Sequence, residues 1–104
     1  MPRFYVKWEI DRTKIPLDPA ERVKLWMSML EMVKDGLNTG VIKDWGMFSG
    51  GTGGYSVGEF KTEAEHFAYL LRWMPYINFE VQPILTVDQT IEAIKKAVAA
   101  AQSK

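Results

Sequence analysis

Glu80 and Lys7 are the two residues whose types could support acid–base chemistry. Each is predicted to lie in a β-strand, Glu80 within INFEVQPIL and Lys7 within RFYVKWEI. If these strands are neighbours, the alternation of side chains places both residues on the same face of a sheet. A carboxylate there could remove a proton next to a carbonyl group, and the ammonium could stabilise the negative charge that develops. The simpler alternative is a cross-strand ion pair that fixes strand register and contributes about a few tenths of a kcal/mol.

Two tyrosines are predicted close to this pair. Tyr5 lies two residues before Lys7, so it shares the face that points away from the helices, and its hydroxyl could donate a hydrogen bond. Tyr55 could do the same from a neighbouring strand, although its side chain could instead face the helices.

His66 is the only histidine and is predicted early in a helix. It precedes Leu70 by four residues and Trp73 by seven, which places it beside an apolar stripe. Its imidazole titrates near neutrality and could shuttle a proton, but a structural residue on the helix flank is the simpler interpretation. No second histidine or cysteine accompanies it, and no ligand spacing links it to nearby carboxylates, so we expect no metal site.

The remaining sequence predicts four strands and three helices. Period-two alternation marks the strands, and Pro, Gly and capping residues mark where helices begin and end. Asp18 and Pro19 begin the first helix, and Gly36 or Gly40 ends it. We expect SGGTGG to form a mobile hairpin tip rather than a phosphate-binding loop, since no Lys-Ser/Thr pair follows it. The expected elements, in order, are a strand over 3–10, a helix from 19, strands over 41–50 and 55–60, a helix from 63 to Pro75, a strand over 77–85, and a helix from 87.

This order is βαββαβ followed by a terminal helix. It predicts an α+β protein with the ferredoxin-like fold, in which helices cover one face of an antiparallel sheet with strand order 4-1-3-2. We expect residues 1–104 to form a single domain. In the terminal helix, Ile91, Ile94 and Val98 are expected to face inward.

Composition limits the classes of function. Thirteen basic and thirteen acidic residues cancel, which argues against nucleic acid or an anionic membrane as a partner. The chain has no cysteine, its N-terminus does not resemble a signal peptide, and no apolar run approaches the length of a membrane span. We therefore expect a small cytoplasmic protein.

The aromatic content points to a second subunit. Four Trp, four Tyr and five Phe are many for one small core. The sheet face opposite the helices is predicted to be amphipathic, so a second copy packed against that face could cover it. We therefore expect a homodimer rather than a monomer with a solvated sheet.

Three segments resemble the muconolactone isomerase family. They are the opening strand RFYVKW, the segment GYSVGEF and, most specifically, the run LRWMPYINFEVQPI. Lys7, Tyr55, Ser56 and Glu80 match the family pattern, whereas Tyr5 replaces a histidine and Gly46 stands where the family usually has an arginine after Trp45. The resemblance implies a dimeric α/β barrel, in which the sheets of ferredoxin-like units pack in pairs, and it allows a higher oligomer of dimers.

The resemblance also implies a function. It favours a small cofactor-free enzyme that moves a proton on an unsaturated lactone or a related carbonyl compound, with Glu80 and Lys7 as catalytic residues. The expected substrate-binding residues are Tyr5, Tyr55, Ser56, Trp45 and His66. Two alternatives remain, a non-catalytic protein that binds or senses a small molecule and a structural subunit. A cavity with converging polar groups would separate these hypotheses.

Overall fold

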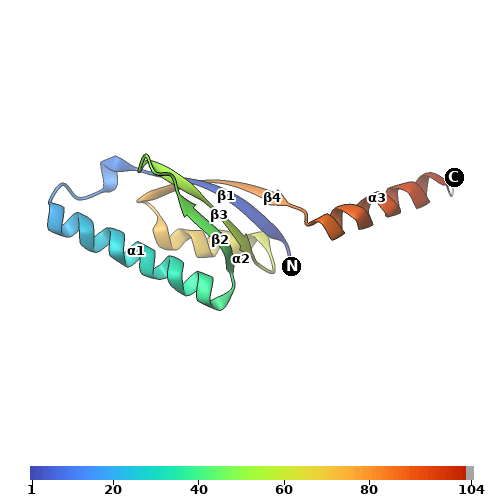
Figure 1. The fold of residues 1–104 in the computed structure, drawn as a ribbon, viewed down its shortest axis with the longest axis horizontal. Coiled ribbons are helices and arrows are strands. Elements are labelled where there is room, and N and C mark those ends of the chain that lie inside the picture. The colour runs from blue at the N-terminus through green and yellow to red at the C-terminus, as the bar shows by residue number, and fades with distance from the viewer. Residues whose placement is uncertain (103–104) are drawn as a thin grey trace.

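The computed structural model describes residues 1–102 as an antiparallel sheet with two helices on one face and a third helix extending away from it (Figure 1). This is the α+β fold expected from the sequence. The long axis of the molecule measures 66 Å, because the third helix projects beyond the sheet. The elements are β1 (Arg3–Ile10), η1 (Arg12–Lys14), α1 (Pro19–Thr39), β2 (Ile42–Met47), β3 (Gly53–Glu59), α2 (Glu63–Leu70), η2 (Leu71–Trp73), β4 (Ile77–Ile84) and α3 (Val87–Gln102).

The sheet has the strand order β2-β3-β1-β4, which confirms the predicted order 4-1-3-2. β1 is central and pairs antiparallel with both β3 and β4. Its register places Lys7 opposite Glu80 of β4 and opposite Tyr55 of β3. The two strands predicted to carry acid–base chemistry are therefore direct neighbours.

Capping groups begin the helices where the sequence predicts. The Asp18 carboxylate accepts a hydrogen bond from the backbone N–H of Glu21 at 3.0 Å, and Pro19 takes the first helical position of α1. Gly40 ends α1 in the left-handed region, at a φ of 84°. The Thr62 hydroxyl caps α2 by accepting from the N–H of Glu65 at 3.1 Å.

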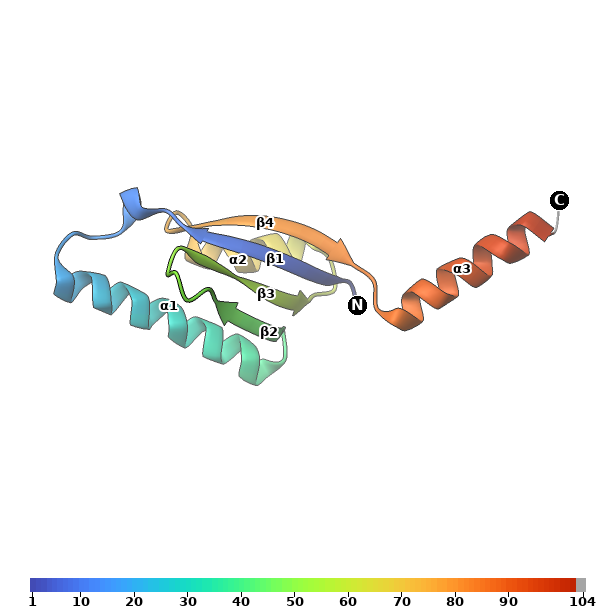
Figure 2. The same cartoon turned by 45° about the horizontal axis from the view of Figure 1, so that its top comes forward.

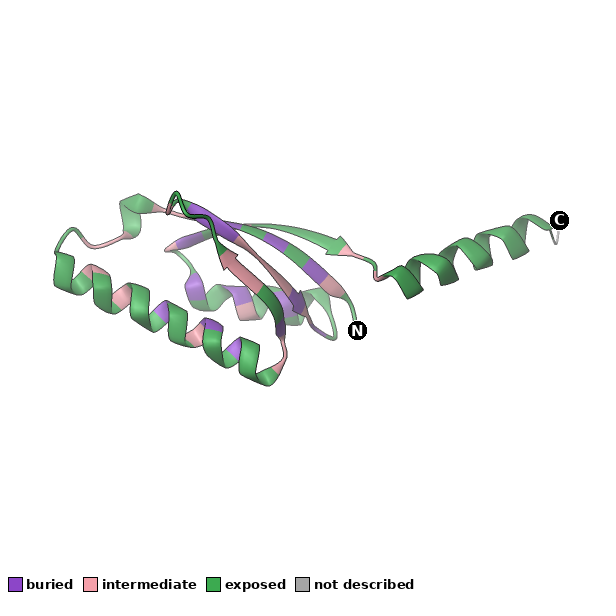
Figure 3. Cartoon of the chain, viewed as in Figure 1, coloured by how far each residue is buried: buried purple, intermediate pink, exposed green. Residues whose placement is uncertain are grey.

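Alternation along β1 divides the sheet into two faces. Phe4, Val6 and Trp8 are buried beneath the helices, whereas Tyr5 and Lys7 are exposed on the other side. We call these the inner and outer faces. Figure 3 shows the buried positions concentrated where α1 and α2 lie over the strands, and exposed positions along α3.

The glycine-rich hairpin is only partly a turn. Gly53 and Gly54 belong to β3 and are buried, so only part of the predicted mobile tip lies in the turn. A Cβ on Gly54 would lie 2.1 Å from the carbonyl oxygen of Gly46 and 2.4 Å from the Trp8 ring. Glycine at this position therefore allows β2, β3 and Trp8 to approach closely.

The third helix departs from expectation. Ile91, Ile94 and Val98 were expected to face inward, but they are 44%, 59% and 49% exposed, and no residue of α3 is buried. Figure 2 shows the helix leaving the end of β4 and running away from the sheet. A periodic apolar pattern identifies the helix and its apolar side, but it does not tell what covers that side. Within residues 1–102, no helix combines the length and the hydropathy that crossing a membrane requires.

Candidate binding cavity and outer-face residues

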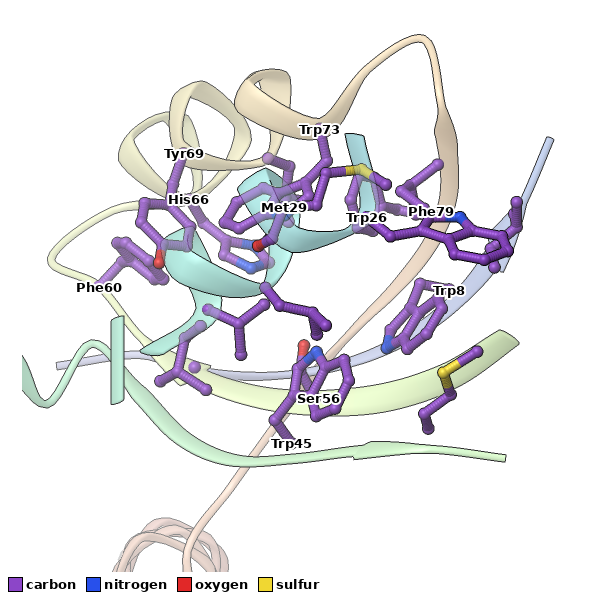
Figure 4. A pocket seen from close by; sticks show the side chains of 18 of the residues that line it. Trp8, Trp26, Met29, Trp45, Ser56, Phe60, His66, Tyr69, Trp73 and Phe79 are labelled. Atoms are coloured by element: carbon purple, nitrogen blue, oxygen red, sulfur yellow. Dashed lines mark hydrogen bonds between the residues drawn. The ribbon is translucent and has the colours of Figure 1, made fainter. Parts of the chain in front are cut away.

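A cavity of about 320 Å³ lies between the inner face of the sheet and the helices. The strands form its floor, while α1 and the α2–η2 segment form its walls (Figure 4). Its lining is almost entirely aromatic and aliphatic, as the following residues show: Trp8, Ile10, Trp26, Met29, Leu30, Val33, Ile42, Trp45, Met47, Gly51, Ser56, Gly58, Phe60, His66, Tyr69, Leu70, Trp73, Ile77 and Phe79.

All four tryptophans of the chain line this cavity. On the floor, Trp8 and Trp45 stack with ring centroids 5.5 Å apart and planes at 17°. The indole N–H of Trp8 donates to the carbonyl of Tyr55 at 3.2 Å, and that of Trp73 donates to the carbonyl of Met29 at 3.4 Å. These bonds fix two of the rings while their apolar faces remain available for packing.

His66 is the buried polar side chain of the inner face. It is only 4% exposed, so it packs between α2 and the sheet rather than at an exposed flank of the helix. Its imidazole stacks on Phe4, with centroids 4.4 Å apart, and lies tilted against Phe60 at 5.0 Å. Burial disfavours the charged form and lowers the pKa of His66 below its usual value. A neutral imidazole therefore lines the cavity near pH 7.

Tyr69 is a cavity residue that the sequence analysis missed. Its hydroxyl is buried and forms no hydrogen bond within residues 1–102. A Cβ on Gly36 of α1 would lie 2.3 Å from this hydroxyl oxygen, so the glycine makes room for it. Burial raises the pKa of the phenol, and Arg72 lies over the ring at 5.0 Å. The sequence feature that could have identified Tyr69 is its position three residues after His66, because that spacing places both side chains on the same side of a helix.

Lys7 and Glu80 lie on the outer face, opposite each other in register and exposed. No ion pair joins them within the described chain, residues 1–102. Together with Glu9, Asn78 and Phe79 they line a shallow hollow of about 190 Å³. The two groups are thus adjacent, as predicted, but a single chain leaves them open to solvent.

The two predicted tyrosines accompany them. Tyr5 and Tyr55 stack on the outer face with centroids 6.4 Å apart and planes at 12°. The Tyr55 hydroxyl donates to the carboxylate of Asp44 at 3.0 Å, which raises the pKa of the phenol. The alternative that Tyr55 faces the helices is therefore wrong.

The seven predicted site residues thus divide between two faces of the sheet. Ser56, Trp45 and His66 line the inner cavity, while the catalytic candidates and both tyrosines lie outside. The sheet itself lies between the two groups, so they do not form one site within a single chain. Sequence alternation could have shown this for Tyr55 and Ser56, which are consecutive residues of β3 and must point to opposite faces.

Charged side chains are also absent from the lining of the inner cavity, since no Asp, Glu, Lys or Arg within residues 1–102 lies there. Arg22 lies over the Trp26 ring at 5.6 Å, outside the cavity lining, as does Arg72 over Tyr69. No group of three or more His, Asp or Glu side chains in the same described region is arranged to hold a metal ion.

These features define a ferredoxin-like α+β protein with an aromatic cavity between sheet and helices. The chain belongs to the family described as "Domain of unknown function (DUF3303)", whose family model matches residues 2–98. Its fold is similar to that of a crystal structure of muconolactone isomerase, with a TM-score of 0.64 and 23% sequence identity over 81% of this chain and 88% of the other. No curated protein matches the sequence. The resemblance stated from the sequence is confirmed at the level of the fold.

Proposed function

We propose that this protein binds a small, largely apolar molecule in the inner cavity. The observation that carries the proposal is an aromatic cavity of about 320 Å³, with all four tryptophans and no charged side chain in its lining. This volume falls at the lower end of small-molecule sites, which span roughly 300–1,000 Å³. The lining of stacked and tilted rings suits a flat ring system that contacts them face-on or edge-on.

The experiment is a titration with naphthalene, an apolar two-ring probe, followed by the four indole N–H signals in NMR. Binding in the cavity should shift these signals in a saturable manner, because every tryptophan lines it. Ser56→Phe should fill the cavity and weaken binding by about tenfold or more. Val57→Phe is the matched control, because it adds the same ring at the next residue of β3, on the opposite face. Equal binding by both variants, or no saturable shift in the unaltered protein, would refute the proposal.

A second candidate function is cofactor-free proton transfer on an unsaturated lactone or related carbonyl compound at the outer face. The observation that favours it is the direct opposition of Lys7 and Glu80 beside a shallow hollow. A second copy packed on this face would shield Glu80 from water and enclose the hollow. The candidate therefore requires the homodimer, and it is tested by Glu80→Gln.

A further inference from the structure

His66 is a nearly buried polar side chain with no hydrogen bond to its ring within residues 1–102. The imidazole has aromatic surroundings, since Phe4 stacks on it and Phe60 lies tilted against it. Figure 4 shows His66 beside Tyr69 and Phe60 at one end of the cavity. The fully buried polar side-chain atoms without a hydrogen bond within residues 1–102 are Arg22 Nε and the Tyr69 hydroxyl, so the ring nitrogens of His66 keep access to the cavity. A ligand atom can therefore bond the imidazole edge in place of water.

The charge of the lining limits what that ligand can be. No acidic or basic side chain among the described residues lines the cavity, so a bound carboxylate or ammonium would lose its hydration without gaining an ionic partner. The imidazole is itself neutral, since burial lowers its pKa. The cavity therefore favours an uncharged molecule over an ion of the same shape.

The size of the cavity sets the number of rings. An apolar cavity of about 150 Å³ holds one benzene molecule, and this cavity is roughly twice that volume. A molecule with two rings fits this space.

Because neutral imidazole carries one donor and one acceptor nitrogen, a hydroxyl or carbonyl on the ligand can complete a hydrogen bond with it.

We infer that the cavity selects an uncharged two-ring aromatic compound with one hydroxyl or carbonyl group, and that this group bonds the imidazole of His66. This inference rests on the proposed binding function and adds the ligand class and the residue that recognises it. Ser56 and Tyr69 are the other polar side chains of the cavity lining, and the Tyr69 hydroxyl is also buried without a hydrogen bond within residues 1–102. The variant His66→Phe distinguishes the imidazole from these two hydroxyls as the group that recognises the ligand, and the aromatic walls provide the affinity common to all flat ligands.

The test compares three probes of one shape by equilibrium dialysis at neutral pH: 2-naphthol, naphthalene and 2-naphthoate. We expect 2-naphthol to bind about five- to tenfold more tightly than naphthalene, the effect of one neutral hydrogen bond. We expect 2-naphthoate to bind most weakly, because its charge has no partner in the cavity.

His66→Phe keeps a ring for the stack on Phe4 and removes both nitrogens. It should bind naphthalene as the unaltered protein does and lose the preference for 2-naphthol. Tyr76→Phe is the control, because it removes an aromatic hydroxyl from a residue that does not line the cavity and should leave all three affinities unchanged. Since His66 is the only histidine, its ring ¹⁵N signals in the unaltered protein provide a second measurement that needs no variant. They should respond to 2-naphthol far more strongly than to naphthalene.

The outcomes separate the inference from the proposed function. Naphthalene binding with no preference for 2-naphthol, or a preference that survives His66→Phe, overturns the inference and leaves the binding function standing. Binding of 2-naphthoate as tight as that of 2-naphthol overturns the uncharged ligand class. Failure of all three probes to bind overturns both. If His66→Phe does not fold, unchanged ¹⁵N signals on addition of saturating 2-naphthol overturn the inference by themselves.

Discussion

The imidazole of His66 lies flat against the phenyl ring of Phe4, with ring centroids 4.4 Å apart and planes 6° apart. Phe4 is 1% exposed in the central strand, so this contact ties α2 to the middle of the sheet. Phe60 completes the surroundings at 5.0 Å. Such an apolar environment tolerates a neutral imidazole and opposes its protonation.

This contact predicts a pH-dependent stability. The folded-state pKa of His66 lies below its usual value of 6.5, so the unfolded chain takes up a proton more readily. The stabilising contribution of neutral His66 to the free energy of unfolding should therefore be complete above about pH 6.5 and should decrease as the pH drops below that value. The slope is at most about 1.4 kcal/mol per pH unit for one group. Urea unfolding at about pH 7.5, 6.5 and 5.5 measures it.

His66→Phe is the control for this effect, because it removes the chain's only histidine and keeps an aromatic ring. The variant should show a flatter profile in the same window. Glu59 also contributes a pH dependence, since a hydrogen bond from Arg3 lowers the pKa of its carboxyl, but that contribution is lost only at lower pH. Equal slopes for both proteins between about pH 6.5 and 5.5 would contradict the assignment to His66.

Gly54→Ala should destabilise the fold by about 1–3 kcal/mol. The added Cβ would meet the Gly46 carbonyl oxygen at 2.1 Å and the Trp8 ring at 2.4 Å, so β2 or Trp8 must shift. Gly50→Ala is the matched control, because a Cβ there meets nothing within 4 Å. It should change the free energy of unfolding by no more than about 0.5 kcal/mol. Similar losses of stability in both variants would show that the close approach at Gly54 adds no cost of its own.

Much of the fold follows from local signals, as β1 and α1 illustrate. The strict alternation around Phe4, Val6 and Trp8 gives the strand and its buried face, and Asp18 with Pro19 gives the helix start. The position of α3 does not follow, because its periodicity describes the helix and not its neighbours. The division of the site between two faces could be predicted in part, since Tyr55 and Ser56 are consecutive residues of β3 and point to opposite faces. The cavity depends on the positions of α1 and α2 relative to the sheet, and no local sequence pattern specifies those positions.

Removal of α3 should leave the sheet and the cavity intact. No residue of this helix is buried, and none of its residues lines the cavity. A chain ending at Leu85 should therefore keep a melting temperature within about 4 °C of the full chain. Calorimetry measures this change, and the naphthalene titration checks the cavity in the same samples. A larger loss, or loss of binding, would mean that α3 supports the fold through contacts that a single chain does not make.

We predict a homodimer joined through the outer face of the sheet. Tyr5 is 39% exposed and stacks on Tyr55 there, which leaves an aromatic pair uncovered beside Lys7 and Glu80. Sedimentation equilibrium at micromolar concentration should give twice the chain mass of 11.9 kDa. Tyr5→Glu should shift the distribution toward the monomer, since it places like charges at a shared face. Leu17→Glu, a change at a residue that is 92% exposed outside the sheet, should not.

The last prediction concerns Glu80 and the second candidate function. Glu80→Gln keeps the shape of the side chain and removes its basicity. If Glu80 is a general base, turnover of a cognate unsaturated lactone should fall by a factor of about 10² or more. Lys7 on the neighbouring strand would stabilise the enolate, so Lys7→Met should also reduce turnover.

A structural role predicts a different result for the same substitution. An exposed cross-strand pair contributes at most about 1 kcal/mol, so Glu80→Gln would then alter stability slightly and leave any activity unchanged. Gln82→Glu is a useful comparison, because it adds a carboxylate on the same strand and face, opposite Tyr5 rather than Lys7. Rescue of a Glu80→Gln chain by Gln82→Glu would show that the exact opposition to Lys7 is not required. Unchanged turnover in Glu80→Gln, with the dimer preserved, would remove proton transfer by Glu80 and leave ligand binding in the inner cavity as the function to test.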